Sequence, residues 1–129
     1  MKKYKIDCFQ SKESGFTQVD LMIADEVYSG RSQCLEEDKY SRFTGGYIAE
    51  LKAWIKYYKA QLKKYKNKKD IINNLYTNYK YKTPPYNQYP TSIFFESELN
   101  EVEYHIKRIE TRIETLKNHL EIYYKDKND

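Results

Sequence analysis

Hydrophobic and polar residues alternate in two short segments near the start of the chain. The positions that share one face are Tyr4, Ile6 and Cys8 in the first segment and Thr17, Val19, Leu21 and Ile23 in the second. A period of two on both sides of the polar, glycine-containing loop 10–15 predicts a β-hairpin. A third short strand could include Val27 and Tyr28 and is expected to break at Gly30. So small a sheet needs a helix against its apolar face.

A helical period begins further along the chain. Its apolar positions alternate in steps of three and four: Ile48, Leu51, Ile55, Tyr58, Leu62 and Tyr65. This spacing is typical of a coiled-coil seam. We predict a first long helix over residues 39–79, which starts between Asp38 and Gly46 and either continues to about Tyr79 or breaks near Asn67.

The same spacing returns in the last third of the chain, after a Tyr- and Pro-rich loop over residues 80–91. The apolar positions there are Phe95, Leu99, Val102, Ile106, Ile109, Ile113, Leu116, Leu120 and Tyr123. They predict a second long helix over residues 92–126, with a seam roughly 40 Å long at 1.5 Å per residue. An apolar stripe this narrow must pack against a partner helix.

The charges beside the two seams indicate which helix is the partner. One flank of the first seam carries Lys52, Lys59 and Lys66, and the equivalent flank of the second carries Glu96, Glu103 and Glu110. Antiparallel packing brings these flanks together, so opposite charges favour a hairpin within one chain. We therefore predict an α+β fold in a single domain over residues 1–129, with a β-hairpin or small antiparallel sheet within residues 1–30 and two long antiparallel helices forming a coiled-coil hairpin.

Composition narrows the partners that the chain can have. Charged residues make up 33% and aromatic residues 16% of the chain, with a mean hydropathy of -0.97 and a net charge of +4. This profile fits long exposed helices rather than disorder. The basic excess favours anionic partners without identifying one, and it is weaker than in dedicated DNA-binding domains. The lysine run 63–69 could touch phosphates, yet a solvated helix face is the simpler interpretation, so we do not expect nucleic acid as a partner.

The sequence contains no long apolar run, no signal peptide and no zinc spacing around its two cysteines. We therefore expect a cytoplasmic protein without a membrane partner. Cys8 and Cys34 are interpreted as small buried hydrophobes. No nucleophile stands near a candidate base, and His105 and His119 are too far apart along one helix to share a metal. We expect neither catalysis nor a cofactor.

One flank of the helix pair carries residues that suit a nucleotide. Tyr47 and Trp54 fall on the flank of the first helix that faces His105 and Arg112 of the second. An aromatic row beside a cationic row can stack a base and neutralise a phosphate. The alternative is that Trp54 packs under the β-hairpin.

A second candidate lies before the first helix. Arg31 and Arg42 bracket this segment, and Gly45 and Gly46 stand near the expected helix start. Exposed amides at a helix N-terminus bind phosphate. The alternative is that the glycines form a helix cap or allow close backbone packing.

The segment from residue 30 to residue 53 resembles a pattern found in small proteins of phages and prophages. The matching residues are Gly30, Arg31, Cys34, Glu37, Asp38, Gly45, Ile48, Ala49, Lys52 and Ala53. With the expected hairpin and two helices, the chain is similar to the first family of Thoeris anti-defence proteins. The resemblance implies a phage sponge in the host cytoplasm, which binds a cyclic ADP-ribose isomer or a cyclic oligonucleotide without turnover. It implies phosphate contacts for Arg31 and, less directly, for Arg108 and Arg112.

Two further expectations concern partners. Tyr57, Tyr104 and Tyr124 lie off the seams, so we expect another copy to cover them in a homodimer or a higher oligomer. The alternative to ligand capture is a phage inhibitor or interaction module, which binds a host protein or nucleic acid through its Tyr- and Lys-rich surface.

Overall fold

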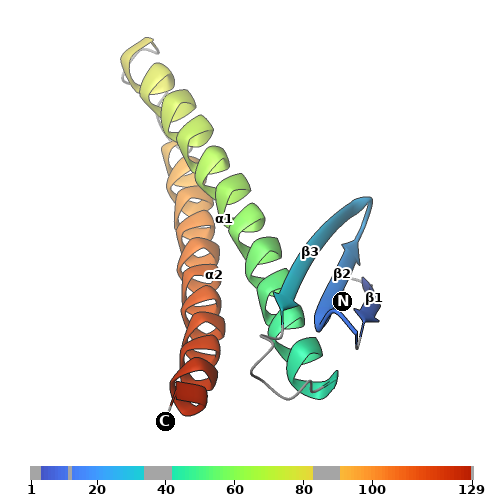
Figure 1. Cartoon of the computed structure of the whole chain (residues 1–129). Helices are drawn as coiled ribbons and strands as arrows, with labels where there is room; N and C mark the ends of the chain where they lie inside the picture. The colour runs from blue at the N-terminus through green and yellow to red at the C-terminus, as the bar shows by residue number, and fades with distance from the viewer. Residues whose placement is uncertain (1–3, 12, 34–41, 83–90, 129) are drawn as a thin grey trace. The chain divides into compact units, whose positions relative to one another are not determined.

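The computed structural model describes residues 4–11, 13–33, 42–82 and 91–128 and shows a small sheet followed by two long helices (Figure 1). The elements in chain order are β1 (Tyr4–Ser11), β2 (Phe16–Ile23), β3 (Glu26–Gln33), α1 (Arg42–Lys82) and α2 (Thr91–Asn128). The three strands form an antiparallel sheet in the order β1-β2-β3. The predicted α+β class and order of elements are confirmed.

The strand register follows from the two tight connections of the sheet. β1 pairs with β2 from Tyr4 opposite Ile23 to Ser11 opposite Phe16, and β2 pairs with β3 along its whole length. Gly15, with φ of 70°, closes the first turn, while Ala24 adopts a φ of 56° in the second. A positive φ is rare for alanine. The sheet is therefore a simple meander whose centre is β2.

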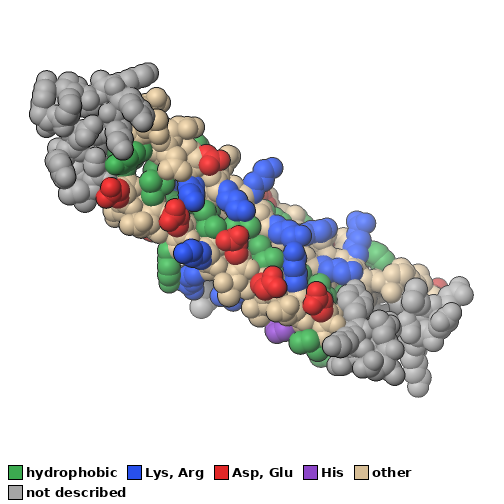
Figure 2. Space-filling view, turned by 90° about the vertical axis from the view of Figure 1, so that its left-hand side faces the viewer, with side chains coloured by type: hydrophobic (Ala, Val, Ile, Leu, Met, Phe, Trp, Pro, Cys, Tyr) green, Lys and Arg blue, Asp and Glu red, His purple; other side chains and the backbone are tan. Residues whose placement is uncertain are grey.

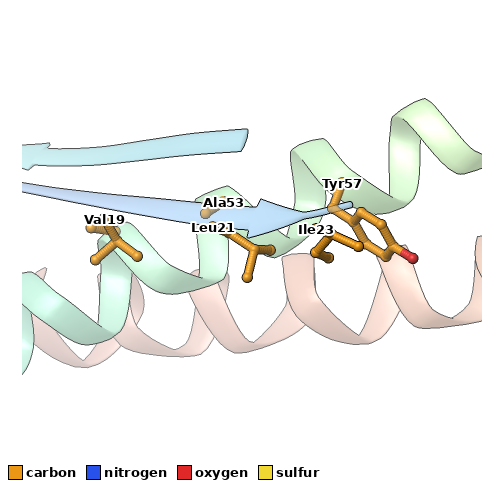
Figure 3. Packing of buried hydrophobic residues seen from close by; sticks show 6 residues of the cluster. Val19, Leu21, Ile23, Ala53 and Tyr57 are labelled. Carbon is orange, nitrogen blue, oxygen red and sulfur yellow. The ribbon is translucent and has the colours of Figure 1, made fainter. Parts of the chain in front are cut away.

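The core of the sheet is one face of β2 packed on the first turns of α1. The buried residues of this cluster are Val19, Leu21, Ile23, Ala49, Ala53 and Tyr57. Figure 3 shows the β2 side chains and the α1 side chains Ala53 and Tyr57 gathered between strand and helix. The period-two pattern thus orients the strand as predicted, and a helix covers its apolar face.

Gly30 corrects one expectation from the sequence, because β3 continues through it to Gln33 instead of breaking there. A Cβ at this position would lie 1.9 Å from the carbonyl oxygen of Ala49 and 2.6 Å from the amide nitrogen of Ala53. The glycine is therefore required for the close approach of α1 to the sheet rather than for a turn.

The two helices pack against each other in the predicted antiparallel manner. α1 begins at Arg42 and runs without a break past Asn67. Residues 59–112 form a compact unit of their own, and residues 1–58 and 113–129 form the other. The core of the first of these units consists of Ile72, Val102 and Ile106, with Leu62, Tyr65, Phe95 and Leu99 packed around them.

The ion pairs between the helices among the described residues involve other lysines than the predicted Lys52, Lys59 and Lys66, although Glu103 is a predicted partner. The Nζ of Lys68 lies 3.0 Å from Glu98, and that of Lys69 lies 3.3 Å from Glu103. Hydrogen bonding to Glu98 raises the pKa of Lys68. Charge complementarity across an antiparallel pair is as expected, but the axial register selects the lysines of the central basic run.

Three further points concern predictions made from the sequence. Cys8, expected to be buried, is exposed, because it lies on edge strand β1, of which no described residue is buried. Cys34 and residues 83–90 of the loop predicted over residues 80–91 lie outside the described residues, and α1 extends through Lys82. Neither α1 nor α2 contains, in its described part, a stretch long and apolar enough to cross a membrane.

Candidate functional site

A group of aromatic and cationic side chains in mutual contact lies on the helix pair of residues 59–112. The imidazole of His105 on α2 stacks on the ring of Tyr65 on α1, with centroids 5.2 Å apart and planes 23° from parallel. Tyr65 sits on the seam, so its half-buried ring is held by the core around Ile106. The coiled-coil packing therefore fixes His105 beside an aromatic platform.

Further contacts of His105 lie on α2 itself. The ring of Tyr104 meets His105 edge-on at 5.7 Å, and Arg108, one turn further, places its guanidinium carbon 5.7 Å from the Tyr104 centroid. Tyr104 keeps 58% of its surface exposed. The Nε2 of His105 lies 4.0 Å from Glu101, which precedes it by one turn. We call Tyr65, Tyr104, His105 and Arg108 the aromatic-cationic cluster.

This arrangement has the chemistry to hold a planar anion. Exposed aromatic rings stack bases, and a guanidinium pairs with phosphate oxygens in bidentate fashion. A cation–π contact at an exposed site contributes only about 0.5–1 kcal/mol, so Arg108 can exchange Tyr104 for a phosphate at little cost. Arg112, one turn beyond Arg108, is exposed and adds a second guanidinium to the same stretch of α2.

Trp54 and Tyr47, the predicted aromatic partners of His105, contact residues of β1 and of the start of α1. Trp54 contacts Tyr4 of β1 edge-on at 5.1 Å, and it also meets Tyr57 and Tyr58. The alternative prediction, packing of Trp54 under the hairpin, is the one that the structure shows. Tyr47 is 39% exposed and stacks on the more exposed Phe43 at 6.2 Å.

Arg31 lies on the face of the sheet that points away from α1. Its Nε donates to the side-chain oxygen of Gln18 at 3.1 Å, beside Asp20. Hydrogen bonds from Ser29, at 2.6 Å, and from Gln18 lower the pKa of Asp20, and the charge of Arg31 lowers it further. Arg31 is exposed but is already part of a polar network with an acid.

The candidate phosphate site at the start of α1 is not assembled from the described residues. The neighbour of Arg31, Ser32, points to the opposite face and donates to the carbonyl of Gly45 at 3.0 Å. Gly45 itself packs on Thr17, whose hydroxyl would lie 2.6 Å from an added Cβ. Close backbone packing is therefore the role of this glycine. Arg42 is the first residue of α1, but its side chain lies outside the described residues.

Positive and negative side chains are mixed on one face of the molecule. Figure 2 shows Lys and Arg side chains interspersed with Asp and Glu side chains over one face of the molecule. A polyanion such as duplex DNA is bound by a continuous basic face. This face therefore suits a small anion, which needs only one or two cations, better than a long one.

The structure divides the predicted ligand residues between the two compact units. His105, Arg108 and Arg112 lie along α2 in the unit of residues 59–112, whereas Arg31, Tyr47 and Trp54 belong to the other unit. Tyr65 was not predicted to belong to the site because it lies on the seam, and Tyr104 was predicted to form an oligomer contact. For Tyr104, its place next to His105 in the sequence was an available signal.

No family model, curated protein or solved structure matches this chain. The resemblance to the Thoeris anti-defence family therefore stays a hypothesis.

Proposed function

We propose that this protein binds a small anionic nucleotide on the aromatic-cationic cluster and does not transform it. The observation that carries the proposal is the continuous contact of Tyr65, His105, Tyr104 and Arg108, which joins a base-stacking platform to a guanidinium. A base stacks on the exposed Tyr104 ring while Arg108, helped by Arg112, pairs with a phosphate. Stacking on aromatic side chains contributes about 1–3 kcal/mol per base.

The family resemblance supplies the ligand class and the biological setting of the proposal. It implies that the ligand is a cyclic ADP-ribose isomer or a cyclic oligonucleotide, which the protein sequesters as a phage anti-defence sponge in the host cytoplasm. Binding without turnover is the essential step, because an intact but unavailable signal no longer activates its receptor. In this proposal the protein works stoichiometrically and as a homo-oligomer.

Calorimetry with cyclic ADP-ribose isomers and cyclic oligonucleotides tests the proposal. We expect tight binding of at least one of them, and recovery of the intact molecule after heat denaturation. Tyr104→Ala and Arg108→Ala should each weaken binding about tenfold, since a stacked ring contributes about 1–3 kcal/mol, a charge-assisted hydrogen bond contributes about 1.5–3 kcal/mol, and about 1.4 kcal/mol is tenfold in affinity. Lys107→Ala, next to Arg108 on α2, is the matched control and should bind like the unmodified chain.

Three outcomes contradict the proposal. Failure to retain any of these nucleotides excludes the ligand class. Release of a chemically altered nucleotide shows turnover and makes the protein an enzyme. Equal loss of affinity in Lys107→Ala and Arg108→Ala would mean that general charge, rather than the cluster, attracts the ligand.

A second candidate function, docking on a host protein, is favoured by apolar side chains at the surface. Phe43 is 81% exposed, and Phe94 on α2 is 68% exposed. Aromatic residues are enriched where proteins meet. A stoichiometric host protein that is retained by the unmodified chain and lost with Phe43→Ser or Phe94→Ser, together with no nucleotide binding, would favour this function over the first.

A further inference from the structure

α1 packs on the two edge strands of the sheet to different extents. β2 buries every second residue against the helix, whereas no described residue of edge strand β1 is buried. Tyr4 and Ile6, which lie on the same face of the sheet as the core, keep 56% and 36% of their surface exposed. The apolar face of β1 therefore extends beyond the cover that α1 provides.

The opposite edge, β3, is held by α1. The Nζ of Lys52 donates to the carbonyl oxygen of Arg31 at 3.0 Å, and Ser32 donates to the carbonyl of Gly45. Gly30 brings this strand into direct contact with the helix backbone. β1 is thus the open edge among the described strands. Its eight residues contain no proline, and its charged residues Lys5 and Asp7 are of opposite sign, so this edge is a template for pairing with a strand of complementary charge.

We propose that β1 pairs with the β1 strand of a second copy, antiparallel about a two-fold axis that passes through Ile6. In this register Ile6 lies opposite Ile6, and Tyr4 lies opposite Cys8. Lys5 of each copy lies opposite Asp7 of the other, twice per dimer. The axis is perpendicular to the sheet, so the faces that α1 covers stay on the same side and the exposed apolar side chains of β1 meet.

The charges select this register among its neighbours. With the two-fold axis perpendicular to the sheet, a side chain can lie opposite only a side chain of the same face. The pairing can therefore shift only by two residues at a time, which moves the axis by one residue. Moving the axis to Asp7 places two aspartates opposite each other, and moving it to Lys5 does the same for two lysines. Like charges directly opposite each other are destabilising, whereas opposite charges are favourable.

The position of Asp7 in the sheet makes a nearby cation favourable. Within one chain Asp7 lies directly opposite Asp20 of β2, which is an unfavourable like-charge pair. Asp20 has its own partners in Ser29 and Gln18. A lysine from a second copy on the open side of β1 would offset the repulsion that Asp7 experiences.

Charge reversal in both directions tests the register. We expect the unmodified chain to be a dimer in sedimentation equilibrium at micromolar concentration. Lys5→Glu and Asp7→Lys should each raise the dimer dissociation constant about tenfold or more, because each creates two like-charge pairs. The double variant Lys5→Glu/Asp7→Lys restores both pairs and should return to within about threefold of the unmodified chain. Lys5 is exposed, and circular dichroism checks that each variant folds.

Disulfide trapping tests the axis directly. In a chain with Cys8→Ser and Cys34→Ser, Ile6→Cys should form a covalent dimer on mild oxidation, since directly opposite side chains lie about 4.5–5.5 Å apart. The matched control, Val27→Cys, is also exposed but lies on β3 and should stay monomeric in a denaturing gel.

Three results would overturn the strand interface. A monomer mass for the unmodified chain excludes it. An oligomer that neither single charge variant weakens must form elsewhere, for example through the helices. Equal cross-linking of Ile6→Cys and Val27→Cys would show random collision instead of a fixed axis. None of these measurements involves a nucleotide, so their outcome is independent of the proposed ligand binding.

Discussion

Gly30→Ala is the substitution that most directly tests the packing of α1 on the sheet. In a β-strand, alanine is normally the more stable choice than glycine by roughly 0.5–1 kcal/mol, because it restricts the unfolded chain. Here the added Cβ would stand 1.9 Å from the Ala49 carbonyl oxygen and 2.6 Å from the Ala53 nitrogen. Both contacts are with backbone atoms, which no side-chain rotation can move away.

The size of the effect follows from the kind of contact. Overpacking a core costs about 1–3 kcal/mol when side chains can shift, and more when they cannot. Moving a helix away from the sheet also loosens the contacts of Leu21 and Tyr57 with their neighbours. We therefore expect a loss of about 3 kcal/mol or more, which is a large share of the roughly 5–15 kcal/mol that stabilises a typical domain.

Urea unfolding followed by far-UV circular dichroism measures this change, with Gly46→Ala as the matched control. Gly46 lies in the same helix, and its added Cβ would meet only the side chain of Gln10, at 4.0 Å. The control should be more stable than the unmodified chain by about 0.5–1 kcal/mol, since glycine weakens a helix interior. If Gly30→Ala were as stable as the unmodified chain, α1 could not approach the sheet this closely, and the reasoning would be refuted.

Three further predictions concern single groups. Thr17→Val should stabilise the protein by about 1 kcal/mol in urea unfolding, because the buried Thr17 hydroxyl has no hydrogen-bond partner among the described residues. The hydrogen bond to Glu26 raises the pKa of Tyr28 from 10.0 to about 12. This hydrogen bond therefore stabilises the folded protein fully below pH 10, and the stabilisation is lost as the pH rises to about 12. In Glu26→Gln, absorbance titration should show Tyr28 ionising at lower pH. Ile106→Ala should cost about 2–5 kcal/mol, whereas Ile71→Ala, at a site that is 57% exposed, should change stability by less than about 0.5 kcal/mol.

Periodicity was sufficient to predict the strands and the helix seam, because burial on one face is what creates each period. The alternation from Thr17 to Ile23 became the buried face of β2, and the steps of three and four through Val102 and Ile106 became the helix core. Gly30 was misinterpreted for a physical reason. The sequence alone does not distinguish a glycine that ends a strand from a glycine that allows a helix to pack closely against the strand.

The candidate site was predicted only in part. Heptad arithmetic placed His105 on a flank that faces the other helix, and it does face that helix. The arithmetic could not name Tyr65 as its partner, because the axial offset between two helices is set by their core packing and by the loop between them. The heptad position of Trp54 could not distinguish a ligand contact from packing under the hairpin. Its contact with Tyr4 depends on the sheet, which lies far away in sequence.

The order of the elements has a consequence for how the chain folds as it is made. Both strand ladders join neighbours along the chain, and the cluster from Val19 to Tyr57 includes no residue of α2, although residues 113–129 complete the same compact unit later. Contacts this local form fast. At ordinary elongation rates the sheet and its covering helix can fold while α2 is still unsynthesised. The nascent chain would then carry a finished β1 edge before the helix pair exists, which makes neighbouring nascent chains on one messenger RNA the earliest place where two copies could meet.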